Sequence, residues 1–188
     1  DECIKELKTD ITEIEEKTED DYTITGNKIH GTRVFGGIAI GPYTFIDGLK
    51  GYMIVAPHSQ RYEDVQIQWC TKNGNIDGLT RNTNPDWIDP NTGVDNTSHL
   101  VVNKPNNRTF PAAEYCYNLV FEGCDDYFLP NKQELAYIQK HINIIDTVDE
   151  TGGFGIGYYL SSSESTEHST WHVRFSEGNV GNMFKNST

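Results

Sequence analysis

Oxygen-bearing side chains are concentrated in one short stretch of the chain and are of the types that Ca²⁺ prefers. The four residues are Asp86, Asp89, Asn91 and Asp95. An EF-hand loop that began at Asp89 would need Gly at its sixth position and Glu at its twelfth, where the chain has Val94 and Leu100. A looser calcium site stays open, but the turn-forming tendency of Asp and Asn explains the same residues. We therefore expect no metal and no cofactor, with Ca²⁺ as the one alternative.

Histidine is the other residue type in this chain that could support catalysis. The histidines are His30, His58, His99, His141, His168 and His172. None of them forms an i, i+4 pair within an expected helix, and the chain has neither an HExxH nor a GxSxG motif. His168 and His172 flank Trp171 and could line a surface pocket. We expect the chain not to be an enzyme, and we treat these two histidines as candidate binding residues.

The charge balance excludes several classes of partner. The chain has 188 residues with 28 acidic and 15 basic side chains, so its net charge is −13. Nucleic-acid binding needs clustered Lys and Arg, and an anionic membrane surface would repel this chain. No apolar run is long enough for insertion into a membrane. We therefore expect no nucleic-acid partner and no membrane insertion.

Residues 1–20 have a narrow apolar stripe that is typical of a coiled coil. Its seam, at heptad positions a and d, comprises Ile4, Leu7, Ile11 and Ile14. Ile at both kinds of position favours three strands over two. We expect this segment to be the stem of a homotrimer, and a lone amphipathic helix lying on the domain is the alternative.

After the stem, β-branched residues and frequent Gly indicate a β-rich neck or collar over residues 21–48. Ordinary hairpins of the main domain are the alternative. Residues 49–188 then form the head, with strands expected at 51–57 and 65–69 and a long polar loop at 71–99. A loop of this length is unusual in a compact domain unless it has a function.

Two helices are expected in the middle of the head. Pro and Gly bracket an amphipathic helix over residues 111–123. A second helix begins near Asn131, because Glu134 follows three residues later in the spacing of a capping box.

Strands are expected again near the end of the chain, at residues 158–160 and 171–175. In the second of these, Trp171, Val173 and Phe175 alternate with polar residues, so we expect these three side chains to face the core. The sequence SEGN that follows is typical of a hairpin turn. Helices and short strands together predict an α+β fold.

The four cysteines, Cys3, Cys70, Cys116 and Cys124, have no metal-binding spacing. Cys116 and Cys124 flank a hydrophobic run and could form a disulfide in a secreted protein. Buried free thiols are the alternative that we favour.

Three stretches of the head, AAEYCYNLVFEGCDDYFLPNKQEL, YYLSSSES and TWHVRFSEGNV, share their order and spacing with a known pattern. They resemble bacterial and phage domains of the DUF1566 (Lcl C-terminal) type over about half the chain. The matching positions are Ala113, Cys116, Leu119, Gly123, Asp126, Leu129, Pro130, Glu134, Leu135, Tyr159, Ser161, Ser162, Trp171, Val173, Phe175 and Gly178. Tyr127 and Phe128 depart from the pattern, since the family usually has Trp-Arg there.

The resemblance implies a C-type lectin-like fold, in which two helices flank small antiparallel sheets and long loops share one face. Leu129, Pro130, Trp171 and Phe175 would then be core residues, and Glu134 would be a helix cap. The family usually has a further strand after the hairpin, so in this chain we expect that strand to be missing or supplied by another segment.

Three polar segments would form a binding surface: residues 71–99, 161–170 and 177–185. Their mixture of aromatic, amide and hydroxyl groups suits recognition of sugars and of protein surfaces. The candidate binding residues are Trp87, Asp89, Asn91, Ser163, Glu164, His168, His172, Asn179 and Asn182.

A stem followed by such a head predicts a bacteriophage virion protein, a head or tail fibre whose heads bind a host-surface glycan or protein. Several weak heads on one trimeric stem would gain avidity without new contacts. The protein would lie on the virion surface, beside other virion proteins. Two alternatives stay open: an exported bacterial adhesin on the cell surface, and a purely structural capsid decoration protein.

Overall fold

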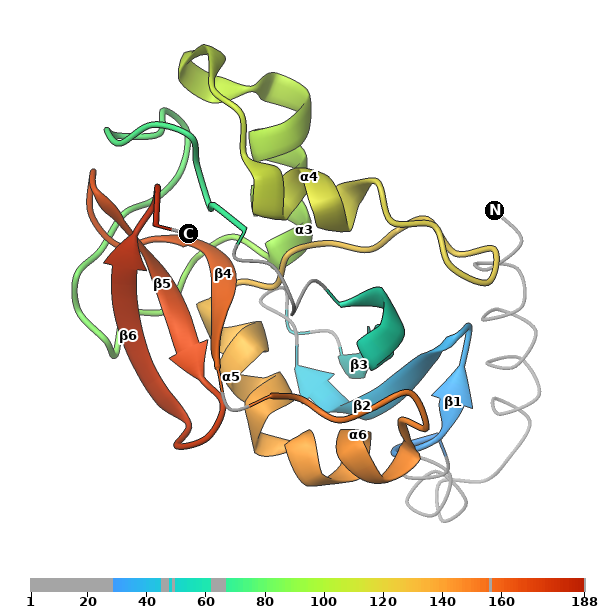
Figure 1. The fold of residues 1–188 in the computed structure, drawn as a ribbon. Helices are drawn as coiled ribbons and strands as arrows, with labels where there is room; N and C mark the ends of the chain where they lie inside the picture. Colours follow the sequence, from blue (N-terminus) through green and yellow to red (C-terminus); the bar gives the residue numbers. More distant parts are fainter. Residues whose placement is uncertain (1–28, 45–47, 49, 62–66, 156, 188) are drawn as a thin grey trace.

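The computed structural model describes residues 29–44, 48, 50–61, 67–155 and 157–187, whose arrangement Figure 1 shows. This part of the chain is mixed α+β, as expected, with four α-helices and two three-stranded antiparallel sheets. The expected stem, with Ile4, Leu7, Ile11 and Ile14, and the first part of the expected neck lie outside the described residues. None of the described helices is long and apolar enough to cross a membrane.

The first sheet has the strand order β1-β2-β3. Its strands are β1 (Arg33–Val34), β2 (Gly37–Thr44) and β3 (Lys50–Val55). Ile38 lies opposite Val55 and Ile40 opposite Met53, so these alternate apolar side chains enter the core from one face. The strand expected over residues 51–57 is thus confirmed, and it pairs directly with strands from the expected neck.

In the sequence, the described α-helices all come after the strands of the first sheet and before those of the second. The α-helices are α3 (Gly93–Ser98), α4 (Pro111–Tyr117), α5 (Lys132–Lys140) and α6 (Ile142–Val148). Three shorter helical turns are η1 (His58–Gln60), η2 (His99–Asn103) and η3 (Pro105–Asn107). The long loop expected at 71–99 is therefore irregular only as far as Thr92, where α3 is capped.

Helix α4 begins at Pro111, as predicted, but it ends at Tyr117, earlier than the expected helix over 111–123. The expectation that Gly123 terminates the helix is wrong. Glu122 and Gly123 have φ values of +50° and +84°, and the residues on either side of them pair as a two-residue hairpin. Consecutive positive φ values are typical of a tight turn, in which Gly avoids steric strain.

The start of α5 is confirmed by a complete capping box. The Asn131 side chain accepts the Glu134 N–H at 2.9 Å, and the Glu134 carboxylate accepts the Asn131 N–H at 2.8 Å. Leu135, Ile138 and Ile145 are buried, so α5 and α6 share an apolar face. One residue, His141, separates the two helices.

The second sheet has the strand order β4-β5-β6. Its strands are β4 (Tyr158–Glu164), β5 (Ser169–Arg174) and β6 (Asn179–Phe184). Trp171, Val173 and Phe175 are buried, which confirms the expected alternation. Two expectations are wrong: residues 161–164 continue strand β4 instead of forming an exposed loop, and most of the tail is strand β6.

Two apolar clusters form the core. The first contains residues of β2, β3, β5, α5 and α6 and thereby joins both sheets. The second lies around α4 and contains Trp69, Cys70, Ile76, Leu100, Phe110, Ala112, Ala113 and Leu129. Leu129, Trp171 and Phe175 are at most 7% exposed, as the family resemblance implied, and Pro130 is partly buried.

Trp69 is part of this core without being in a strand. The expected strand at 65–69 is wrong for its described residues, since Ile67, Gln68 and Trp69 have no ladder partner. The Trp69 side chain is instead 1% exposed, and its indole N–H donates to the carbonyl of Ser161 at 2.8 Å. Burial of a large ring with a satisfied N–H fixes this segment against β4.

The cysteines differ from both expectations. Cys116 is a free thiol, so the possible bridge between Cys116 and Cys124 does not form. The favoured alternative, free thiols at both positions, is confirmed for Cys116 and wrong for Cys124, which is disulfide-bonded, while Cys70 is a buried free thiol. The partner of Cys124 lies outside the described residues.

Candidate binding site

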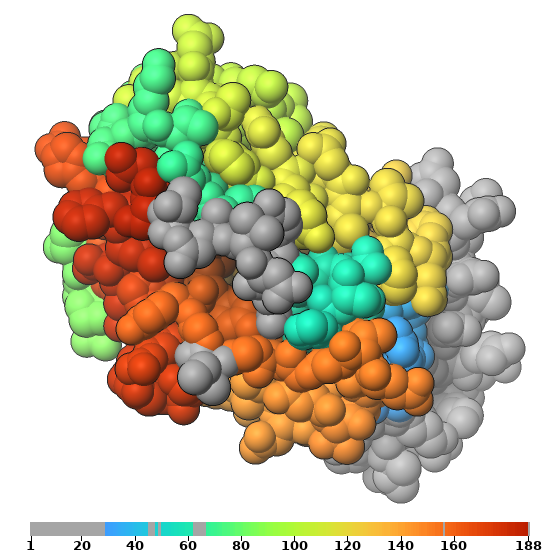
Figure 2. All heavy atoms as spheres, in the orientation of Figure 1, coloured from blue at the N-terminus to red at the C-terminus, as the bar shows by residue number. Residues whose placement is uncertain are grey.

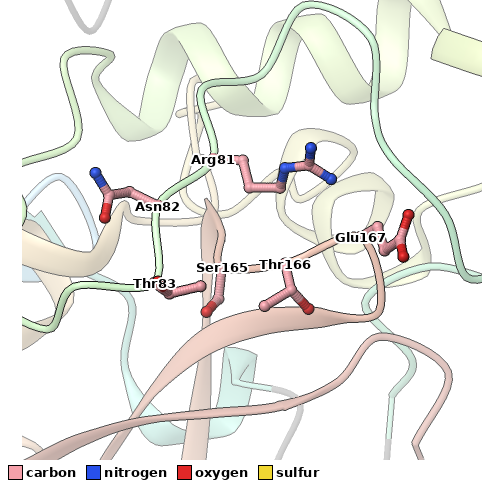
Figure 3. A pocket seen from close by; sticks show the side chains of 6 residues that line it. All are labelled: Arg81, Asn82, Thr83, Ser165, Thr166 and Glu167. Atoms are coloured by element: carbon pink, nitrogen blue, oxygen red, sulfur yellow. The ribbon is translucent and has the colours of Figure 1, made fainter.

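Two of the three expected binding segments meet at a surface pocket with a volume of about 530 Å³. The loop between Trp69 and α3 contributes Arg81, Asn82 and Thr83 on one side. The turn between β4 and β5 contributes Ser165, Thr166 and Glu167 on the other, as Figure 3 shows. The lining is therefore entirely polar or charged.

The loop side of the pocket is tied to the second sheet. Arg81 pairs with Glu164 through a parallel β-bridge, and the indole N–H of Trp171 donates to the Asn82 carbonyl at 3.1 Å. The Asn82 side-chain oxygen accepts the N–H of Asn84 at 2.8 Å, which makes an Asx turn. These bonds hold the backbone of residues 81–84 in one conformation.

Residues of α5 hold the next part of the same loop. Lys132 donates to the carbonyl of Pro85 at 2.7 Å and lies 4.7 Å from the centroid of the Trp171 ring. The Gln133 amide donates to the carbonyl of Trp87 at 2.8 Å. Burial lowers the pKa of Lys132, and the nearby acidic residues of this loop oppose that shift.

The turn side of the pocket is organised by one hydroxyl. Thr166 Oγ1 accepts the N–H groups of His168 at 3.1 Å and of Ser169 at 3.0 Å. The same oxygen lies 2.6 Å from the Ser169 hydroxyl. Ser165 is fully buried as a residue, yet its hydroxyl has no hydrogen-bond partner among the described residues. A buried polar atom without a partner is uncommon in native proteins and requires an explanation.

A buried ion pair lies directly behind this turn, between Glu164 and Lys185, whose side chains are both 0% exposed. Lys185 Nζ also donates to the carbonyls of Gly74 at 2.8 Å and Glu167 at 3.2 Å. Glu164 Oε1 accepts the N–H of Ile76 at 3.2 Å, whereas its Oε2 has no partner among the described residues. The pair thus joins the end of β6 to the loop and the turn.

Burial raises the pKa of Glu164 and lowers that of Lys185, because a low-dielectric environment disfavours both charged forms. Their hydrogen bond and mutual attraction oppose both shifts. The positive charge of Arg81 also favours the ionised Glu164. The segment around Cys70 also lies beside this pair, because the N–H of Cys70 donates to the Lys185 carbonyl at 2.9 Å. Figure 2 shows the resulting contact between the C-terminal residues (red) and the green segment.

An exposed aromatic ring lies next to the pocket on the same face of the sheet. Phe184 is 65% exposed and stands opposite Ser169 in the β5–β6 ladder. Directly opposed residues of an antiparallel pair place their side chains on the same face, about 5 Å apart. Ser169 contacts Thr166 of the pocket lining, so a single residue of β5 separates the position of Phe184 from that lining. Asn182, opposite Trp171, lies on this face too.

Several of the predicted binding residues are accessible. His168, Asn179 and Asn182 are exposed, and Trp87 and Asn91 are partly buried. Asn182 shares the face of Phe184, and His168 lies 3.2 Å from the Glu167 carboxylate. The third expected segment, residues 177–185, contributes none of the six residues that line the pocket.

Four predicted binding residues, Asp89, Ser163, Glu164 and His172, are buried instead. Ser163 donates to the Asp89 carboxylate at 2.6 Å, and Asn96 donates to it at 3.0 Å. His172 packs edge-on against Tyr158, and burial lowers the pKa of the imidazole. These four side chains belong to the interior of the domain. The polar composition of their segments had suggested that they face solvent.

The proposed calcium ligands do not converge. The Asp89 carboxylate is occupied by protein donors, and Asp95 completes the capping box of α3 with Thr92. Asp86 is exposed in the loop. Over the described residues, no group of three or more His, Cys, Asp or Glu side chains is arranged to hold a metal ion.

Sequence reasoning did not single out the pocket residues Arg81, Ser165 and Thr166, nor the adjacent Phe184. They lie within the three expected segments, but no periodicity or motif marks them individually. An unpaired Arg in a long polar loop was the one available signal. The chain matches no protein-family model, and comparison with curated proteins and with solved structures also gives no match.

Proposed function

We propose that this chain is a receptor-binding fibre protein of a bacteriophage, and that its C-type lectin-like head binds a glycan on the host cell. The proposed binding surface is the pocket formed by residues 81–83 and 165–167 together with Phe184. The observation that carries the proposal is this pairing of a polar pocket with an exposed aromatic ring on one face. Sugar rings present C–H groups that stack on an aromatic face and hydroxyls that bond to amides, hydroxyls and guanidinium groups.

The rigidity of the pocket supports a role in recognition. The Asx turn at Asn82, the hydroxyl bonds of Thr166 and the carbonyl contact of Trp171 fix both walls before any ligand arrives. A preorganised site loses less conformational entropy on binding, so modest contacts suffice for useful affinity. Recognition requires no bond-making step, and the proposed role is non-catalytic and needs no cofactor.

The stem completes the proposal. The heptad seam Ile4, Leu7, Ile11 and Ile14 would associate three chains, and three heads would engage a repetitive cell surface together. Weak single-head affinity would then suffice for attachment. In this arrangement the heads lie on the virion surface and the stem joins them to other virion proteins.

A glycan array and whole-cell binding to a panel of bacteria test the head. Phe184→Ala removes the exposed ring, and we expect it to lower binding about two- to tenfold, since ring stacking is worth roughly 0.5–1.5 kcal/mol. Val120→Ala is the matched control, because Val120 is 67% exposed but follows α4, away from the pocket lining. Equal binding by both variants and the unaltered protein would overturn the proposed site. Binding to no cell would instead favour a structural decoration role.

Light scattering on the intact chain at micromolar concentration tests the stem. We expect a trimer, and replacement of Leu7 and Ile11 by Ser should convert it to a monomer whose heads keep their single-site affinity. A monomeric unaltered chain would contradict the trimeric fibre without affecting the binding site.

A further inference from the structure

We propose that the pocket selects a sugar residue that carries an anionic group, a carboxylate or a phosphate, and that Arg81 pairs with that group. This inference rests on the proposed function, because it concerns the ligand of the same pocket. It follows from three observations: the guanidinium of Arg81 without a hydrogen bond, the donors left free on the loop side of the lining, and the buried hydroxyl of Ser165.

The two charged residues of the pocket lining differ in their partners. Of the six lining residues, Arg81 is the one cation and Glu167 the one anion. Glu167 lies 3.2 Å from a ring nitrogen of His168, whereas the Arg81 guanidinium has no hydrogen-bond partner among the described residues. Glu164 behind the pocket is paired with Lys185, so that pair adds no net charge. The charge of Arg81 acts on the buried Glu164, but the N–H groups of its guanidinium make no hydrogen bond among the described residues and are available to a ligand.

The free groups on the loop side of the lining, from Arg81 and Asn82, are mainly donors. The Asn82 side-chain oxygen already accepts the Asn84 N–H, which leaves the amide NH₂ for a ligand. The acceptor capacity of Thr166 Oγ1 is used by two backbone N–H groups. Arg81 has only donors, in a fork that matches a carboxylate or phosphate. A lining of this kind is complementary to a group that has only acceptors.

The hydroxyl of Ser165 gives the second, independent indication of a ligand. Ser165 is 0% exposed, lines the pocket and makes no hydrogen bond with any described residue. Leaving such a group unpaired costs roughly 1–3 kcal/mol, and an acceptor in the pocket removes that cost. Ser165 and Arg81 lie on opposite walls of the pocket, so a ligand that occupies it would meet both side chains.

The size of the pocket and the charge of the whole chain sharpen the inference. A volume of about 530 Å³ lies in the range of small-molecule sites and holds a monosaccharide unit. The net charge of −13 opposes non-specific adsorption of anions. Any preference for an acidic sugar must therefore come from local contacts and should depend on Arg81.

Calorimetry with three matched oligosaccharides tests the inference: one that ends in glucuronic acid, one in glucose 6-phosphate and one in glucose. We expect tighter binding of one or both acidic sugars than of the glucose probe. Arg81→Gln should lower the affinity for the acidic sugar at least about tenfold, with little effect on the neutral one. Lys140→Gln is the matched control, because Lys140 is exposed at the end of α5 and loses the same charge. Ser165→Ala should lower the affinity for the acidic sugar and leave the affinity for the neutral sugar unchanged.

The outcomes separate this inference from the proposed function. If all three probes bind with equal affinity, or if Arg81→Gln lowers all three affinities equally, the preference for an anionic sugar is overturned. The proposal that the head binds a glycan is then unaffected. If no probe binds, the anionic preference is overturned, and unchanged whole-cell binding by Phe184→Ala then overturns the proposed site as well. Circular dichroism of each variant checks that the fold is retained.

Discussion

Lys185, which directly follows the last strand, and Glu164, which ends β4, form an ion pair from which solvent is fully excluded. Because Lys185 also donates to the carbonyls of Gly74 and Glu167, one ammonium group joins β6, the loop after Trp69 and the β4–β5 turn. The loop and the turn supply the six residues that line the proposed pocket. The pair is therefore a structural support for the site as well as for the C-terminal strand.

Breaking this pair from one side should strongly destabilise the domain. Lys185→Met leaves the Glu164 carboxylate buried without its cation, and we expect the free energy of unfolding to fall by about 3–5 kcal/mol. The double variant Glu164→Gln with Lys185→Met should lose less than the single variant, because no uncompensated charge remains. Urea denaturation measures both, and Lys140→Met serves as an exposed control with a change within about 0.5 kcal/mol. A double variant less stable than Lys185→Met would contradict this account.

Asp149 should make the stability depend on pH in the acid range. Burial alone would raise its pKa, but bonds from Thr151, the His58 N–H and the Arg61 guanidinium together hold the pKa below the ordinary value of 3.8. Because its pKa is lower in the folded state than in the unfolded state, ionised Asp149 contributes to the free energy of unfolding. This contribution is fully present above pH 3.8 and is lost as the pH falls through the lowered pKa. Asp149→Asn should therefore cost about 1–3 kcal/mol near neutral pH and progressively less below pH 3.8. Urea midpoints measured across this range test it, and a constant difference at every pH would count against it.

Glu134 joins the N-terminal ends of two helices. Its carboxylate accepts the Asn131 N–H at 2.8 Å and the Gly93 N–H at 3.1 Å, so it caps α5 and holds the start of α3. Glu134→Gln replaces one acceptor oxygen by an NH₂ that faces these N–H groups, and we expect a loss of about 1–3 kcal/mol. Glu150→Gln, on an exposed residue, is the control. Thermal unfolding compares the two, and equal midpoints would show that the cap contributes nothing.

The cysteines should separate into two classes on alkylation. Under denaturing conditions without reductant, we expect Cys70 and Cys116 to be labelled and Cys124 to be labelled only after reduction. In the folded protein Cys116 should react slowly, because burial raises the pKa of its thiol to about 12 and leaves little thiolate at neutral pH. Peptide mass spectrometry reads the labelled positions. Labelling of Cys124 without reductant would contradict the disulfide.

Local signals in the sequence were sufficient for the features that depend on neighbouring residues. Asn131 and Glu134 are three residues apart, and their capping box is as predicted. Trp171, Val173 and Phe175 alternate within one strand, and all three are buried. In each case the partners lie on the same turn or strand, so the spacing alone specifies the contact.

The same reasoning failed for polar residues whose partners are distant in the chain. The run from Ser161 to Ser165 has the composition of a loop, yet it is buried. Its hydroxyls and carboxylate bond to Trp171, Asp89 and Lys185, which no local pattern links to it. Buried polar groups are stable only where such partners exist, and the partners become known only when the segments are placed in space.

Taken by itself, the sequence determined the α+β class, the start of α5 and the inward face of β5. It also named three polar segments, two of which meet at the pocket. Only the tertiary structure decided which residues of those segments face solvent and which are buried. It brought Arg81 to Ser165 and placed Phe184 beside them, while it enclosed Glu164 and His172. The physical reason is that secondary structure follows from spacing within a few residues, whereas a site is set by the packing of segments far apart in the chain.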